Sequence, residues 1–144
     1  MATTPKLPSR LHHTAYVTRD LEATRKFYED LIGLPLLATW CEVDELFGAE
    51  RVYCHLFFGL GDGGALAFFK FAKPEDEELF GPKMPATPFH HIALNVDKDT
   101  QQAIEKRLEP LNVLCDKILL GPTGNRLKVE REHDIDQNRR RLPR

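Results

Sequence analysis

The chain has 144 residues, which is enough for one compact domain with a hydrophobic core. Its net charge of −2 predicts no general attraction to nucleic acid or to an anionic membrane, and no apolar run approaches the roughly 20 residues of a membrane span. Three widely spaced cysteines without a CxxC pair favour reduced thiols. Because the N-terminus MATTPKLPSR also lacks the apolar segment of a signal peptide, we expect a cytoplasmic protein.

The first half of the chain has the pattern of a strand, a helix and three further strands. LHHTAYV (11–17) is typical of a strand, and an amphipathic helix follows between Asp20, its expected N-cap, and Gly33, its expected end. The further strands are predicted at 36–43, 51–61 and 65–71. The glycines of GLGDGG precede a strand rather than a helix, so they predict a hairpin turn and not a phosphate-binding loop.

The second half restarts the same series after a stretch rich in proline and acid (72–88), which we predict to be a linker. FHHIALNV (89–96) is typical of a strand, and Asp97 or Asp99 is the expected N-cap of a helix. Further strands are predicted at 117–121 and 126–130, followed by a charged, solvated tail at 131–144. The sequence thus predicts one domain, 1–144, with a first module at 11–71 and a second at 89–130.

The two modules begin with closely similar strands, in which His13 and His91 are 78 residues apart. By alternation along a strand, His13 shares a face with Ala15, and His91 shares a face with Ala93. Small neighbours leave room for an ion and a substrate, and neutral imidazole is a ligand for Fe, Zn, Ni or Mn. A lone histidine on a strand is more often structural, but recurrence at equivalent positions favours a shared site.

Three segments together, LHHTAYVTRDLEATRKFYEDLIGLPLL, GALAFFKF and FHHIALNV, resemble the vicinal oxygen chelate superfamily. This group includes glyoxalase I, bleomycin-resistance proteins and extradiol dioxygenases. The resemblance covers roughly residues 10–110 and implies a mixed α/β fold, in which two paired βαβββ modules form an open, curved, barrel-like sheet. It implies the fold more strongly than the reaction, because one scaffold hosts several chemistries.

The resemblance also implies a divalent metal, Fe, Mn, Zn or Ni, with His13, His91 and Glu130 as its ligands. Lys70 and Lys128 stand where the family commonly has a carboxylate or an amide, and protonated lysine cannot bind a metal. Two alignments of the end of the chain remain open. Either 126–130 is the final strand, with Glu130 replacing the usual ligand, or that strand is an earlier one and the second module is incomplete.

Four other residues are candidates for contact with a substrate. His55 is expected to line the cleft or to act as an acid or base, and the alternative is an ordinary strand residue. Trp40 could form a pocket wall, Phe68 could contact substrate although such residues are more often core, and Lys70 could place a cation in the cleft. Glu130 is the only carboxylate that we nominate for catalysis.

Three classes of function remain open at this point. The first is a metal-dependent enzyme acting on a small substrate with vicinal oxygens, either a dioxygenase or a glyoxalase-type isomerase. The second is a metal-free protein that sequesters a small molecule, like the bleomycin-resistance proteins, and the third is a degenerate paralogue. We also expect a homodimer, because family modules need partners for exposed sheet edges.

Overall fold

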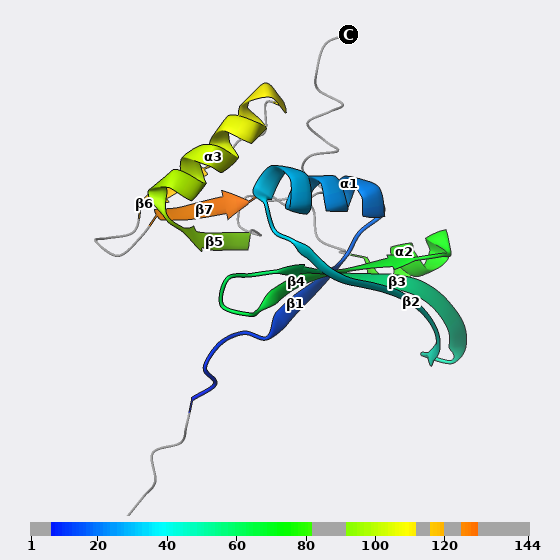
Figure 1. Cartoon of the computed structure of the whole chain (residues 1–144). Coiled ribbons are helices and arrows are strands. Elements are labelled where there is room, and N and C mark those ends of the chain that lie inside the picture. Colours follow the sequence, from blue (N-terminus) through cyan, green and yellow to red (C-terminus); the bar gives the residue numbers. More distant parts are fainter. Residues whose placement is uncertain (1–6, 82–91, 112–115, 120–124, 130–144) are drawn as a thin grey trace, which may run out of the picture. The chain divides into compact units, whose positions relative to one another are not determined.

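The computed structural model of the chain describes residues 7–81, 92–111, 116–119 and 125–129 (Figure 1). It is a mixed α/β protein that divides into two compact units. The first unit comprises residues 1–21 and 34–81, and the second comprises residues 22–33 and 82–144. None of the helices in the described ranges is long and apolar enough to cross a membrane.

The first unit contains a four-stranded sheet with the strand order β1-β4-β3-β2. Its strands are β1 (His13–Val17), β2 (Leu36–Leu46), β3 (Ala49–Gly59) and β4 (Ala65–Phe71). β1 runs parallel to β4, and the other neighbours are antiparallel. All four predicted strands are confirmed, although β2 is longer than expected, and Figure 1 shows β2 and β3 curving together away from β1.

Two tight turns set the register of this sheet. Phe47 and Gly48 join β2 to β3 with positive φ angles of 53° and 74°, which is the backbone of a two-residue hairpin turn. The glycine-rich stretch between β3 and β4 closes with a hydrogen bond of 2.8 Å from Leu60 N to Gly64 O, and Gly63 has φ 79°. The prediction of a hairpin turn rather than a phosphate-binding loop is confirmed.

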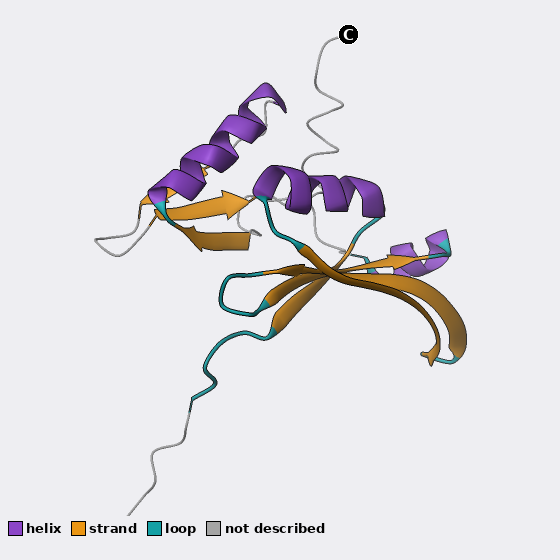
Figure 2. Ribbon diagram, in the orientation of Figure 1, coloured by secondary structure: helices purple, strands orange, loops and turns teal. Residues whose placement is uncertain are grey.

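The stretch predicted as a linker contains a short helix, α2 (Pro74–Phe80), which the sequence analysis did not predict (Figure 2). Proline at its first position is compatible with a helix start, and acidic residues in the first turn favour the positive end of the helix dipole. α2 is tied to the sheet by ion pairs from Arg51 to Asp76 and from Lys70 to Glu77.

Side chains alternate between the two faces of the first sheet, and one face is apolar and almost fully buried. It carries Leu56, Phe58, Leu66 and Phe68, none of them more than 4% exposed. The opposite face carries His13, His55 and Trp40. The period of two therefore separates a structural face from the face that bears the candidate site.

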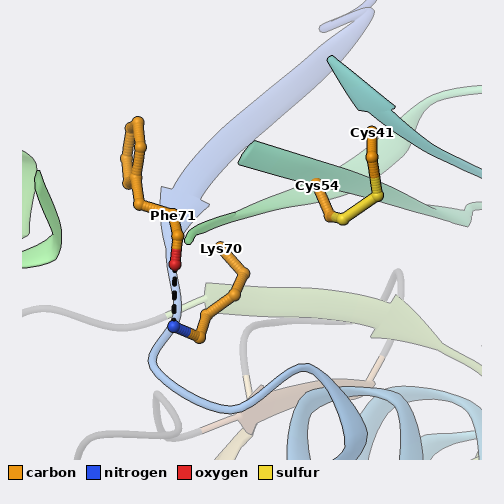
Figure 3. The surroundings of a disulfide bond; sticks show 4 residues. All are labelled: Cys41, Cys54, Lys70 and Phe71. Atoms are coloured by element: carbon orange, nitrogen blue, oxygen red, sulfur yellow. Dashed lines mark hydrogen bonds between the residues drawn. A yellow bond between two sulfur atoms is a disulfide. The ribbon is translucent and has the colours of Figure 1, made fainter. Parts of the chain in front are cut away.

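A disulfide joins Cys41 on β2 to Cys54 on β3 (Figure 3). The two residues are directly opposite one another in the antiparallel pair, with their Cα atoms 4.0 Å apart. This finding differs from the expectation of reduced thiols. An odd number of cysteines does not exclude one bonded pair, because two of the three can pair and leave one over. The third, Cys115, lies outside the described residues.

The second unit contains a three-stranded sheet with the order β5-β7-β6. Its strands are β5 (Ile92–Val96), β6 (Asp116–Leu119) and β7 (Asn125–Val129), and both pairings are antiparallel. α3 (Lys98–Leu108) begins after Asp97, whose side chain accepts a hydrogen bond from Thr100 N at 2.7 Å. Of the two predicted N-caps, Asp97 is therefore the one that the structure confirms. A 3-10 turn, η2 (Glu109–Leu111), follows α3.

The helix predicted after β1 is present as α1 (Leu21–Arg25), continued by the π-helical η1 (Lys26–Ile32). It ends at Gly33, as predicted, with φ 91°. From Glu22 onward it belongs to the second unit, where Arg107 of α3 donates hydrogen bonds to the Leu31 and Ile32 carbonyls at 2.6 and 3.2 Å. These bonds satisfy carbonyls that a helix end leaves without intrahelical partners.

The direction of β7 bears on the two alignments of the end of the chain. β4 is parallel to β1, whereas β7 is antiparallel to β5, so β7 is not the counterpart of β4. In the second sheet, Lys128 is the backbone partner of Ala93. The predicted ligands His91 and Glu130, and the charged tail at 131–144, lie outside the described residues.

Candidate functional site

The face of the first sheet that carries His13 is covered by aromatic side chains. His55 on β3 stacks on Phe69 of β4 with ring centroids 3.6 Å apart, and the Phe57 ring lies 4.2 Å from that of His55. Trp40 on β2 stacks on Phe57 at 4.9 Å and meets His55 edge-on at 5.1 Å. We call these four residues, Trp40, His55, Phe57 and Phe69, the aromatic layer.

His13 lies at one end of the aromatic layer, with its ring centroid 5.5 Å from that of Phe57. The two residues stand on β1 and β3, with β4 between them. On this face β4 carries Ala65 and Ala67, whose side chains end at Cβ, so the two larger rings can approach one another above them. Ala15 is also small and exposed, which agrees with the room expected around His13.

The other end of the aromatic layer is acidic. The Tyr53 hydroxyl is directed at two carboxylates of β2, Asp44 and Glu42, and its oxygen lies 3.0 Å from Glu42 Oε2. The hydrogen bond to Asp44, burial and the interaction with Glu42 all raise the pKa of Tyr53 far above its usual range. Tyr53 therefore acts as a hydrogen-bond donor that fixes the two acidic side chains, and it does not ionise at neutral pH.

His55 is the buried polar member of the aromatic layer, with only 7% of its surface exposed. In the described part of the chain its Nε2 has no hydrogen-bond partner. Burial lowers the pKa of His55, and the nearby His13 lowers it further, while Glu42 opposes the shift. His55 is therefore neutral at pH 7, and no described residue forms a hydrogen bond with its Nε2.

The structure separates the sequence-predicted site residues into two groups. His13, His55 and Trp40 share one face of the first sheet. Phe68 and Lys70 are on the other face, because they alternate with Phe69 along β4. Phe68 packs near Tyr16 and Phe58 in the buried layer, and Lys70 is paired with Glu77.

Lys70 consequently does not place its charge beside His13. Its ammonium donates a hydrogen bond of 2.8 Å to the Phe71 carbonyl, and Figure 3 shows its side chain directed at this carbonyl. Lys70 therefore does not supply the cation that the sequence analysis expected beside the candidate site. His91 and Glu130 lie outside the described residues, so the structure places neither of them.

Sequence reasoning missed Phe69 and Glu42 as members of this face. Phe69 was not among the candidate residues, and placing Glu42 required the register of β2 against β3. A two-residue turn at Phe47 and Gly48 pairs residues whose numbers sum to 95, and this rule brings Glu42 opposite Tyr53. A turn placed at Phe47 and Gly48 would thus have predicted the register of β2 and β3 from the sequence, but this turn was not predicted.

A sequence model described as the Glyoxalase/Bleomycin resistance protein/Dioxygenase superfamily matches residues 10–118, which is more than half of the chain. The chain belongs to this superfamily. No curated protein matches it. Membership confirms the resemblance drawn from the sequence, and it agrees with a mixed α/β fold whose first sheet is open and curved.

Solved structures of similar fold include members with known ligands. Glyoxalase I of Leishmania major, described as trypanothione-dependent, is 19% identical, with 92% of this chain and 94% of that chain covered and a TM-score of 0.54. A mutant of the fosfomycin resistance protein FosX of Listeria monocytogenes, in complex with Mn(II) and 1S,2S-dihydroxypropylphosphonic acid, is 16% identical. That match covers 84% of each chain with a TM-score of 0.53.

A third similar structure is a glyoxylase/bleomycin resistance protein/dioxygenase domain from Frankia sp. EAN1pec. It is 12% identical, with 88% of this chain and 95% of that chain covered and a TM-score of 0.52. At these identities the likeness concerns the fold. Superfamily membership therefore supports a small-molecule site. The reaction and the metal have to be argued from the residues of this chain.

The imidazole of His13 suits a metal ion, as is expected of a ligand in this superfamily. In the described ranges its hydrogen-bonding contact is the 2.9 Å approach of its Nδ1 to Nδ1 of His12. When His13 is the donor in this bond, its Nε2 carries the lone pair that binds a metal. No three His, Cys, Asp or Glu side chains of the described residues form a group that could hold an ion.

Proposed function

We propose that the chain is a metal-dependent enzyme for a small aromatic substrate with two neighbouring oxygens, and that it cleaves the ring of a catechol-type diol. The observation that carries this proposal is the aromatic layer beside His13. An aliphatic substrate such as a glyoxalase hemithioacetal gains little from stacked rings, whereas an aromatic ring packs on them by offset or edge-on contact. Ring-cleaving dioxygenation is also within the range of this superfamily, whose description includes dioxygenases.

The proposed metal ligands are His13, His91 and Glu130, although Glu130 directly follows β7, a strand that is not the counterpart of β4. Two histidines and one carboxylate are the facial triad of non-haem iron oxygenases, and Fe(II) or Mn(II) is therefore the expected ion. When bound, such an ion acts as a Lewis acid and a template for the two substrate oxygens. By accepting a hydrogen bond from Nδ1 of His13, His12 would hold His13 in the tautomer whose Nε2 is unprotonated.

The aromatic layer would bind and orient the substrate ring. Trp40 is 39% exposed and stacks on Phe57, so it can also stack against an incoming ring. His55 is neutral because burial lowers its pKa, and its Nε2 has no protein partner in the described residues. We propose that this nitrogen accepts a proton from a substrate hydroxyl after a small shift of the layer, which makes His55 the general base.

The proposal is tested with protein loaded anaerobically with Fe(II) and then given oxygen and a catechol. We expect oxygen uptake together with the absorbance of a ring-opened product. Trp40→Ala should raise KM for the diol, and His55→Phe should lower kcat while diol binding is retained. Loaded protein that binds catechols without consuming oxygen would overturn the proposal. In a parallel assay, turnover of a hemithioacetal by protein loaded with Zn(II) or Ni(II) would favour a glyoxalase-type reaction.

A second candidate function is metal-free sequestration of a small aromatic molecule. It is favoured by the finding that the described residues contain no three-ligand group, although they include the whole aromatic layer. Protein treated with a chelator would then bind aromatic ligands as well as untreated protein does, seen as equal ligand-induced rises in melting temperature. Binding that disappears with the metal would exclude this candidate.

We also propose that the chain forms a homodimer. In the described part of the first sheet, β1 and β2 each have a neighbour on one side alone, and exposed strand edges favour pairing with another chain. Light scattering should give twice the chain mass at micromolar concentrations, and a monomer mass throughout that range would contradict the proposal.

A further inference from the structure

The disulfide between Cys41 and Cys54 lies within the two strands that carry most of the aromatic layer. Cys41 stands between Trp40 and Glu42 on β2, and Cys54 stands between Tyr53 and His55 on β3. By alternation, the two sulfurs are on one face of the sheet and the site residues are on the other. The bond therefore links the backbones of both strands at the point where they position the site, without occupying the site itself.

β2 is an edge strand of the first sheet, with β3 as its sole neighbour in the described ranges. Its residues from Thr39 to Glu45 are all exposed, so little apolar burial holds them in place. Besides the backbone ladder with β3, Trp40 is held by its stack on Phe57, and Glu42 is held by the Tyr53 hydroxyl. The disulfide adds a covalent link between the two strands at the point where these contacts are made.

Solvent reaches the disulfide from the side of the edge strand. Cys41 is exposed and Cys54 is half-buried, so a small thiolate can attack the bond. The neighbouring cation does not block this approach, since Lys70 turns its ammonium to the Phe71 carbonyl (Figure 3). In a reducing compartment such a bond is exposed to cellular dithiols.

We propose that Cys41 and Cys54 form a redox switch that controls the position of β2 and, through it, the aromatic layer. A dithiol reductant attacks the bond, the sulfur–sulfur bond breaks, and two protons and two electrons pass to Cys41 and Cys54. The reductant leaves as its own disulfide, and an oxidant of the disulfide class reverses the step. The oxidised form holds Trp40 over Phe57, and the reduced form releases the outer half of β2. The effect on ligand binding rests on the proposed function, whereas the release of β2 does not.

The test uses the full chain with Cys115→Ser, so that a third thiol cannot exchange with the pair. Alkylation and mass spectrometry first establish the bond in protein prepared without reductant and its loss after dithiol treatment. Amide hydrogen exchange is then compared for β2 and for the central strand β4. We expect β2 amides to exchange at least about tenfold faster after reduction, and β4 amides to change little.

The matched control carries Cys41→Ser and Cys54→Ser in the same background. Its β2 amides should exchange fast with and without dithiol, as those of the reduced protein do. Protein whose two cysteines stay reduced even after a mild disulfide oxidant would overturn the proposal, and so would exchange in β2 that reduction leaves unchanged. If β2 responds but no aromatic ligand binds in either state, the switch stands and the proposed function fails.

Discussion

The two sheets of the molecule begin alike in sequence and end differently in structure. β1 begins within a His-His pair of the sequence and β5 begins directly after one, and both precede a helix, yet β1 pairs with a parallel strand and β5 pairs with an antiparallel one. The parallel partner, β4, completes a four-stranded sheet whose open face carries the aromatic layer. In the described part of the second sheet no strand is equivalent to β4. Similar sequences at the start of the two sheets therefore do not imply similar strand arrangements.

The described residues of the two units also differ in the side chains and elements that they contribute. The described residues of the first sheet supply a buried structural face and an opposite face with ring-bearing and acidic side chains. The described residues of the second unit supply the strand that follows His91, and a helix that joins the end of η1 through Arg107. The substrate contacts that we propose thus lie on the first sheet.

The largest effect is expected from the buried face of the first sheet. Phe58 is 0% exposed, and Phe58→Ala should lower the free energy of unfolding by about 3–5 kcal/mol through lost burial and a residual cavity. Val43→Ala, on the exposed edge strand β2, should change it by no more than about 0.5 kcal/mol. Urea titration followed by the fluorescence of Trp40 measures both. Equal effects would remove the distinction between a structural and an exposed part of this sheet.

A smaller effect is expected from His55 at acid pH. Because its pKa in the folded protein lies below the unfolded value of about 6.5, its contribution to stability is complete above that value. It is lost as the pH falls through the folded pKa, because the unfolded chain then binds the proton more readily. His55→Phe keeps the aromatic packing and should flatten this loss between neutral and mildly acid pH. Thermal unfolding across that range tests it, and an unchanged slope would contradict the assignment.

The smallest effect is expected in the second unit, at the N-cap of α3. The backbone N–H of Thr100 lowers the pKa of Asp97, so its contribution is present above the unfolded pKa and is lost as the pH falls through the folded one. Asp97→Ala should reduce stability at neutral pH, and Asp97→Asn should keep the cap while removing its pH dependence. Urea unfolding at neutral and acid pH compares the two, and identical behaviour of both variants would exclude capping as the cause.

Much of the fold could be predicted from local signals in the sequence. Alternation along 65–71, the glycine at position 33 and the acidic cap at position 97 each mark a local feature, and the structure has a strand, a helix end and an N-cap at these points. The helix in the acidic stretch was missed because its richness in proline and acid was interpreted as a linker, although proline and acidic residues suit the first turn of a helix. Residue type was thus sufficient to predict a local feature when the position of the residue within the helix or strand was also considered.

The candidate site was harder to predict, because its geometry depends on register. His13 could be chosen from the repeat, and His55 from its strand, but the pairing of Cys41 with Cys54 depends on the turn at Phe47 and Gly48. Lys70 was assigned to the cleft by analogy with family ligands. A shift of one residue along β4 moves a side chain to the other face of the sheet. Which face Lys70 occupies therefore depends on the register of β4 against its partner strand, which the sequence did not give.

The most direct test of the account is the metal content of the native protein beside His13→Ala and His91→Ala, with His133→Ala as a histidine control from the charged tail. All four are purified without chelator and analysed by plasma mass spectrometry. The account predicts about one divalent ion per native chain, the same for the control, and less than about a tenth of that in each ligand variant. Native protein with a full complement of iron or manganese that neither ligand variant reduces would contradict it, because the repeated histidines would then be structural.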